Sequence, residues 1–138
     1  MPISLSFTEG SVSKEVAQEA ASRVTKLFLE LHSLYGNAVM GPGVTNQVTF
    51  IPKEFSLSNG QPFVGAWVEA KVPRFALSTP ELKKDFLSQS VDIIEGLANG
   101  SINRSDIHGN AVYAEDGAWI LGGEAMTNEE ILAAVSKG

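Results

Sequence analysis

The chain has 138 residues, 43% of them hydrophobic and 19% charged, which is the composition of one globular domain with enough length for a real core. Its formal net charge of −6 argues against binding to nucleic acids or anionic membranes, and without cysteine it can form neither a disulfide nor a thiolate nucleophile. No apolar stretch reaches the about 18 residues of a membrane span, and the N-terminus lacks a signal-peptide pattern, so we expect a cytoplasmic protein.

The first half of the chain predicts a strand, a helix and a second strand. Residues 3–7 alternate between apolar and polar side chains, and Pro2 opens this strand. Ser11 or Ser13 then caps a helix that Gly36 ends. The apolar residues that recur at the helical period are Val16, Ala20, Val24, Leu27, Phe28, Leu31 and Leu34. A strand is expected at 44–51, with Val48 and Phe50 on one face.

The second half predicts the same order of elements, followed by a short additional helix. The elements are a loop at 56–62, a strand at 63–72, a helix from Thr79-Pro80 to Asn99-Gly100, a strand at 111–114, a short ribbon at 118–121, and a helix from Thr127 to about Ser136. Proline suits the first helical position, and Thr127 with Glu130 forms a capping box. His108 is expected in a turn.

The repeated order of elements predicts the fold. Each strand-helix-strand crossover favours a parallel strand pair. We therefore expect an α/β (α+β) fold in which two consecutive β-α-β units form a four-stranded mixed sheet with two helices on one face. The chain is one domain over 1–138, with halves at about 1–58 and 59–138. The other sheet face has no helix to cover it, so we expect other copies of the chain to bury it.

Pro2 is the first candidate for chemistry. If cells remove Met1, the chain begins with a secondary amine at the end of a sheet. An ordinary α-amino group has a pKa of about 8, and desolvation lowers the pKa of an amine. A prolyl amine in an apolar cleft can therefore act as a general base at cell pH. Two alternatives stay open: Pro2 serves only as the first residue of a strand, or Met1 persists and leaves the Pro2 nitrogen as a non-basic amide.

Three sequence features together resemble the 4-oxalocrotonate tautomerase superfamily. They are the Met1-Pro2 start, the turn Phe7-Thr8-Glu9-Gly10-Ser11 that leads into a long helix, and the segment Trp119-Ile120-Leu121-Gly122-Gly123-Glu124. The resemblance covers most of the chain, whose length is similar to that of members built from two fused β-α-β units, such as cis-3-chloroacrylic acid dehalogenase, malonate semialdehyde decarboxylase and macrophage migration inhibitory factor. It implies a homotrimer that acts on a small carboxylate without a cofactor, with the N-terminal proline as catalytic base or acid.

The resemblance also suggests roles for four further residues. Arg74 lies where the dehalogenase and decarboxylase members carry arginines that grip a substrate carboxylate, a task that suits the planar guanidinium fork. His32 and Tyr113 are similar in position to a histidine and a tyrosine that position water in the dehalogenases. Trp119 could shield the proline amine from water. The alternatives are a solvated loop arginine, a packing histidine, a core tyrosine and a tryptophan at a subunit interface.

Departures from the family pattern narrow the expected substrate. Ser11 stands where 4-oxalocrotonate tautomerase has an arginine, and the arginine of its second strand is also missing, so a monocarboxylate or 2-keto acid is expected rather than a dicarboxylate. We predict a tautomerase, an isomerase acting on a small 2-keto or enol carboxylate, with Pro2 as base and Arg74 as the carboxylate ligand. The alternatives are a hydratase or dehalogenase in which His32 and Tyr113 orient water, and a non-catalytic binding protein. No residue pattern indicates a metal site.

Overall fold

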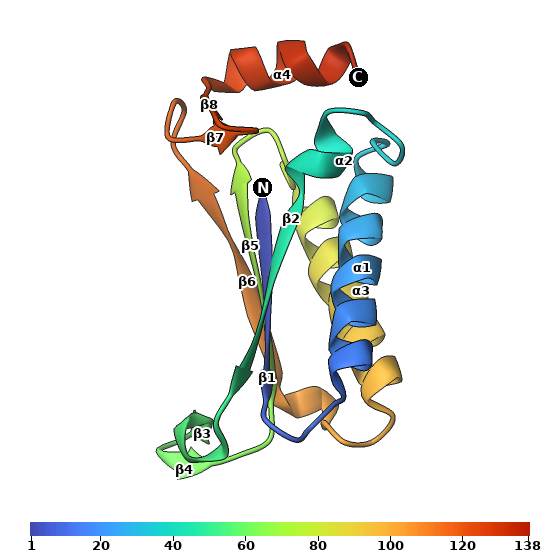
Figure 1. Cartoon of the computed structure of the whole chain (residues 1–138), viewed down its shortest axis with the longest axis vertical. Coiled ribbons are helices and arrows are strands. Elements are labelled where there is room, and N and C mark those ends of the chain that lie inside the picture. Colours follow the sequence, from blue (N-terminus) through green and yellow to red (C-terminus); the bar gives the residue numbers. More distant parts are fainter.

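One mixed sheet of four strands forms the centre of the molecule. The computed structural model describes all residues, 1–138, and its strand order is β2-β1-β5-β6. The four strands are β1 (Pro2–Thr8), β2 (Thr45–Ile51), β5 (Ala66–Pro73) and β6 (Ile107–Ala114). β1 pairs in parallel with β2 and β5 in parallel with β6, while β1 and β5 are antiparallel at the centre of the sheet (Figure 1). This confirms the predicted sheet.

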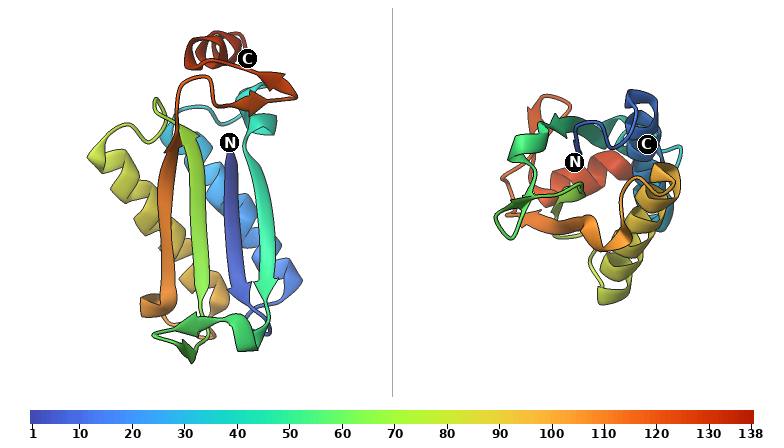
Figure 2. Two further views of the ribbon diagram at one scale, coloured as in Figure 1. Left: turned by 90° about the vertical axis from the view of Figure 1, so that its left-hand side faces the viewer. Right: turned by 90° about the horizontal axis from the view of Figure 1, so that it is seen from below.

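Two long helices lie on one face of this sheet, as predicted. α1 (Lys14–Leu31) and α3 (Pro80–Ala98) pack side by side behind the strands, and no helix lies in front of the other face (Figure 2). β1 turns Ile3, Leu5 and Phe7 toward the helices, where they are fully or almost fully buried. The rings of Phe28 on α1 and Phe86 on α3 meet edge to face, with centroids 5.7 Å apart. The apolar core therefore lies between the helices and the sheet.

The helices begin and end where local side chains satisfy their terminal backbone groups. The side chain of Ser13 accepts a hydrogen bond from the Val16 N–H, and that of Thr79 accepts one from the Leu82 N–H. Asn99 ends α3 in the left-handed conformation, at φ 49°. Of the two predicted caps for the first helix, Ser13 is the one used.

The first helix ends earlier than predicted. It stops at Leu31, five residues before Gly36, because Ser33 adopts a left-handed φ of 56° and reverses the chain. The Leu34 N–H then donates to the Leu29 carbonyl at 2.7 Å, and the Ser33 N–H donates to the Glu30 carbonyl at 3.0 Å. This pair of hydrogen bonds is a Schellman motif, which satisfies the last carbonyls of a helix without glycine.

The remaining elements are short. They are α2 (Met40–Gly43), η1 (Lys53–Phe55), β3 (Leu57–Ser58), β4 (Gln61–Pro62), η2 (Arg104–Asp106), β7 (Ile120–Leu121), β8 (Glu124–Ala125) and α4 (Asn128–Ser136). The segment predicted as a loop between the halves contains the β3-β4 ribbon, and β7 pairs with β8 as the expected short ribbon. No helix is both long enough and apolar enough to cross a membrane.

The position predicted for His108 was wrong, because β6 begins at Ile107 and His108 lies within this strand. Gly109, the next residue, lets this part of the strand approach β5 closely. A Cβ atom at Gly109 would lie 2.3 Å from the carbonyl oxygen of Val68, its register partner. His108 is exposed on the open face of the sheet.

α4 lies across the end of the sheet at which the chain begins (Figure 1). The predicted capping box is present, since the Thr127 side chain accepts from the Glu130 N–H and the Glu130 carboxylate accepts from the Thr127 N–H. Ile131 is fully buried, and the side-chain amide of Asn37 donates to the Val135 carbonyl at 3.0 Å. These contacts hold α4 over the N-terminal end of β1.

Candidate active site at the N-terminus

The N-terminal amine lies in a partly buried position at the end of β1. Met1 is only 4% exposed, and its terminal amino group donates a hydrogen bond to the Gly43 carbonyl of α2. Burial disfavours the charged form of the amine and lowers the pKa of the Met1 amine from 8.0 to about 6. The Met1 amine is therefore mostly neutral at pH 7.

An apolar cavity of about 250 Å³ lies beside Met1. Nine residues line it, and eight of them are hydrophobic. They are Met1, Phe28, Leu34, Met40, Phe75, Ala76, Leu132 and Val135, together with His32. The walls come from the end of α1, from α2, from the segment after β5, and from α4.

His32 lines the cavity but directs both ring nitrogens to the backbone. Its Nδ1 lies 2.8 Å from the Phe28 carbonyl oxygen, and the Leu77 N–H donates to its Nε2 at 2.9 Å. This pattern fits a neutral imidazole with its proton on Nδ1. The ring also packs against that of Phe28, with centroids 4.5 Å apart.

Tyr113 is hydrogen-bonded to the backbone of Leu77, the residue whose N–H binds His32. Its hydroxyl donates to the Leu77 carbonyl at 2.7 Å. Leu77 is fully buried and has a left-handed φ of 48°, a conformation that costs an L-residue about 1–2 kcal/mol. We call the two hydrogen bonds from His32 and Tyr113 to the backbone of Leu77 the Leu77 clamp. The clamp fixes the segment that places Phe75 and Ala76 in the cavity wall.

Arg74 lies next to this segment on the outside of the molecule. Its side chain is exposed, and its guanidinium carbon lies 5.6 Å from the centroid of the Tyr113 ring. The ammonium of Lys83 lies 5.4 Å from the same centroid. Two positive charges therefore gather over Tyr113. Arg74 does not line the cavity, but its neighbour Phe75 does.

The structure is similar to several solved structures. No protein-family model matches the chain, and no curated protein matches its sequence. W0 fused 4-OT, a symmetric trimer, superposes with a TM-score of 0.75 at 16% identity, covering 94% of this chain and 98% of its own. N1, a member of the cis-3-chloroacrylic acid dehalogenase family, gives a TM-score of 0.74 at 13% identity over 91% of this chain and 83% of its own. The chain has the 4-oxalocrotonate tautomerase superfamily fold.

A third structure of this superfamily fold belongs to a decarboxylase. FG41 malonate semialdehyde decarboxylase inhibited by 3-bromopropiolate gives a TM-score of 0.69 at 15% identity, covering 91% of this chain and 92% of its own. All three identities are low, so these likenesses concern the fold.

Within the tautomerase fold, the candidate residues separate into two groups. His32 lies in the cavity wall together with Met1, which precedes half-buried Pro2. Arg74, Tyr113 and Trp119 lie outside the lining. Trp119 is 9% exposed and belongs to the core, and its indole N–H has no hydrogen-bond partner within the chain.

Sequence reasoning missed most of the cavity wall. Leu132 and Val135 lie three residues apart on a predicted helix, a spacing that puts two side chains on one face and that marks an apolar stripe. Nothing in this pattern indicated which surface the stripe would meet. The contact between the last helix and the first residue depends on the tertiary fold alone.

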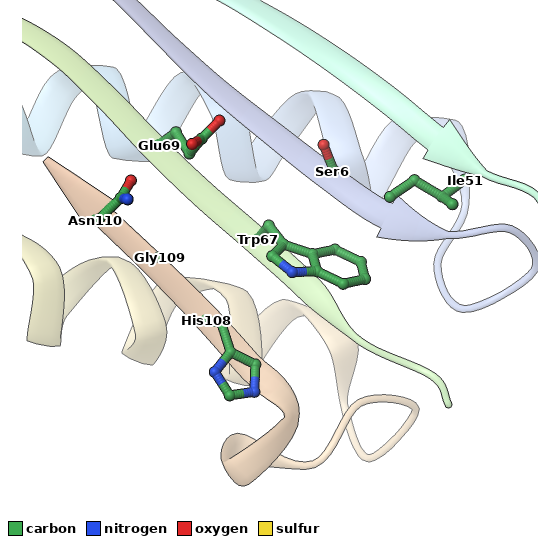
Figure 3. A pocket seen from close by; sticks show the side chains of 7 residues that line it. All are labelled: Ser6, Ile51, Trp67, Glu69, His108, Gly109 and Asn110. Atoms are coloured by element: carbon green, nitrogen blue, oxygen red, sulfur yellow. The ribbon is translucent and has the colours of Figure 1, made fainter. Parts of the chain in front are cut away.

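The open face of the sheet carries a second, shallower hollow of about 430 Å³ (Figure 3). Its lining comes from all four strands and is mostly polar. The residues are Ser6, Ile51, Trp67, Glu69, His108, Gly109 and Asn110. The Trp67 ring is held edge to face against that of Phe63, with centroids 5.4 Å apart. Part of the face that we expect other copies to cover is therefore polar.

Proposed function

We propose that the chain is a cofactor-independent tautomerase that moves a proton on a small 2-keto or enol carboxylate, with the Pro2 amine as base after removal of Met1. The observation that supports this most strongly is the setting of the N-terminal amine. Burial lowers the pKa of the Met1 amine to about 6 beside an apolar cavity. Removal of Met1 moves the amine by one residue to Pro2 and vacates the buried space of the Met1 side chain.

The proposed reaction needs only a base that returns the proton it takes. The neutral Pro2 amine removes a proton from the carbon next to the keto group, which leaves an enolate and a protonated proline. The protonated proline then gives the same proton to the enolate oxygen, and the enol forms with the enzyme unchanged. In the opposite direction the steps reverse. Arg74 supplies positive charge for the substrate carboxylate from the segment that enters the cavity wall.

The geometry favours this activity over a reaction that adds water. A hydratase or dehalogenase of the kind considered above needs polar atoms on His32 and Tyr113 that are free to orient a water molecule. The Tyr113 hydroxyl and the His32 Nε2 are already hydrogen-bonded to Leu77 in the clamp, and the His32 Nδ1 is hydrogen-bonded to the Phe28 carbonyl. Their arrangement supports a positioning role for both residues.

We also propose that the chain assembles as a homotrimer. The open sheet face lacks a covering helix, and W0 fused 4-OT, which shares the fold, is a symmetric trimer. The polar lining of this face means that the interface would be hydrogen-bonded and hydrated in part.

A non-catalytic binding protein would need no free Pro2 amine, so the state of the N-terminus separates this alternative from the proposed tautomerase.

The test is a ketonisation assay on chains whose N-termini have been read by mass spectrometry. With Met1 removed, the protein should convert the enol of a 2-keto acid to the ketone, and Pro2→Ala should reduce kcat by about 10² to 10⁴. Pro62→Ala is the matched control, because Pro62 is exposed on β4 at the far end of the molecule. If Pro2→Ala retains the full kcat, the proposed base is wrong.

A further inference from the structure

The cavity beside Met1 offers a substrate no free polar side chain. Eight of its nine lining residues are hydrophobic, and both ring nitrogens of the ninth, His32, are hydrogen-bonded to the backbone. A carboxylate placed in such a cavity loses its water without gaining a partner. An apolar group placed there gains from burial without this cost.

We infer that the substrates are 2-keto or enol monocarboxylates with an apolar alkyl or aryl tail, and that Leu132 and Val135 of α4 determine this specificity. The inference rests on the proposed function, because it places the tail in the cavity next to the proposed base. Each buried methylene contributes about 0.8 kcal/mol, which is about fourfold in kcat/KM. The cavity measures about 250 Å³ with Met1 in its wall, and removal of Met1 should enlarge it toward the roughly 300–1,000 Å³ typical of small-molecule sites.

α4 is suited to determine specificity because one edge of the helix faces the cavity while another remains in water. Ile131 is fully buried and anchors the helix. Leu132 lines the cavity although it is 48% exposed, so its side chain lies at the rim, where a different side chain can be accommodated. Ala133, the next residue, is exposed and does not line the cavity. The two positions give a matched pair for substitution.

The experiment compares an apolar tail with a carboxylate tail. For the Met1-free protein we expect kcat/KM for the enol of phenylpyruvate to exceed that for the enol of oxaloacetate by at least about tenfold. Leu132→Lys places a positive charge at the cavity rim and should shift this ratio toward oxaloacetate by about tenfold or more. Ala133→Lys adds the same charge outside the cavity and should leave the ratio unchanged. Far-ultraviolet circular dichroism confirms that both variants are folded.

Three outcomes would overturn the inference. They are a wild-type preference for oxaloacetate, equal shifts from both lysine variants, and no shift from Leu132→Lys. If no enol is turned over, the proposed function fails, and calorimetric binding still tests the cavity. Phenylpyruvate should then bind more tightly than oxaloacetate, with the preference reduced by Leu132→Lys and not by Ala133→Lys. Equal binding of the two acids would contradict the inference.

Discussion

Replacing Tyr113 with phenylalanine tests whether the Leu77 clamp is a structural device. The change removes the 2.7 Å hydrogen bond to the Leu77 carbonyl and leaves that buried carbonyl without its side-chain partner. An unpaired buried polar group costs about 1–3 kcal/mol, so we expect Tyr113→Phe to lower the free energy of unfolding by this amount. His32→Ala should lower it further, since it also removes the ring contact with Phe28, worth about 0.5–1.5 kcal/mol.

Urea denaturation of the single and double variants measures this loss. The two side chains bind the same residue, and release of Leu77 from its left-handed conformation by one substitution weakens the other bond. The double variant should therefore lose less than the sum of the single losses, with a coupling energy above about 0.5 kcal/mol. Tyr35→Phe is the matched control, because Tyr35 is 64% exposed, and it should change stability by less than about 0.5 kcal/mol.

The ketonisation rate constant of these variants should change much less than their stability. Both clamp variants should retain kcat within about tenfold while KM rises, since the cavity wall shifts but the proposed base remains. If Tyr113→Phe or His32→Ala lowers kcat by more than about 10² without changing stability, these residues act on the chemistry itself. Release of halide from 3-haloacrylates that depends on His32 would then favour the water-adding alternative.

Other predictions concern the amine, the sheet, the arginine and the assembly. The free energy of unfolding of the Met1-containing chain should fall as the pH decreases from about 8 to about 6, because the folded state disfavours the charged amine, and urea titrations across this range check the trend. Gly109→Ala should lower the thermal unfolding midpoint, since its Cβ would lie 2.3 Å from the Val68 carbonyl oxygen. Arg74→Ala should raise KM by about 10- to 150-fold if the arginine binds the carboxylate, with partial recovery in Arg74→Lys, as steady-state kinetics will show. Sedimentation at micromolar concentration should show three associated chains, and a clean monomer would remove the trimer proposal.

The fold was predictable because its main signals are local. The Ser13 and Thr79 caps and the left-handed Asn99 act within a few residues of the helix ends that they define. The repeated strand-helix-strand order was then enough to predict that each unit contains a parallel pair of strands. The errors also have local causes. Ser33 reversed the chain without the glycine that a sequence pattern looks for, and Gly109 served close strand packing rather than a turn.

The candidate site was predictable only in part. Pro2 and His32 were singled out, and the structure places His32 and the residue before Pro2 in one cavity. No sequence pattern indicated that Tyr113 and His32 would meet at the backbone of Leu77, because this contact joins α1, β6 and the segment after β5. The part of the cavity wall formed by Leu132 and Val135 was missed for the same reason, since an apolar stripe on a helix does not indicate which surface it will contact.

The most direct test of the proposed base compares two forms of one protein that differ only at the N-terminus. An extra leucine inserted between Met1 and Pro2 should prevent removal of the methionine and keep the Pro2 nitrogen as an amide, which intact-mass spectrometry verifies. We predict that ketonisation activity follows the fraction of chains with a free Pro2 amine, and that its acid limb lies near pH 6 rather than near pH 8, the range that burial of the neighbouring Met1 amine indicates. Equal kcat values for the free and the blocked forms would contradict the assignment of Pro2 as the base.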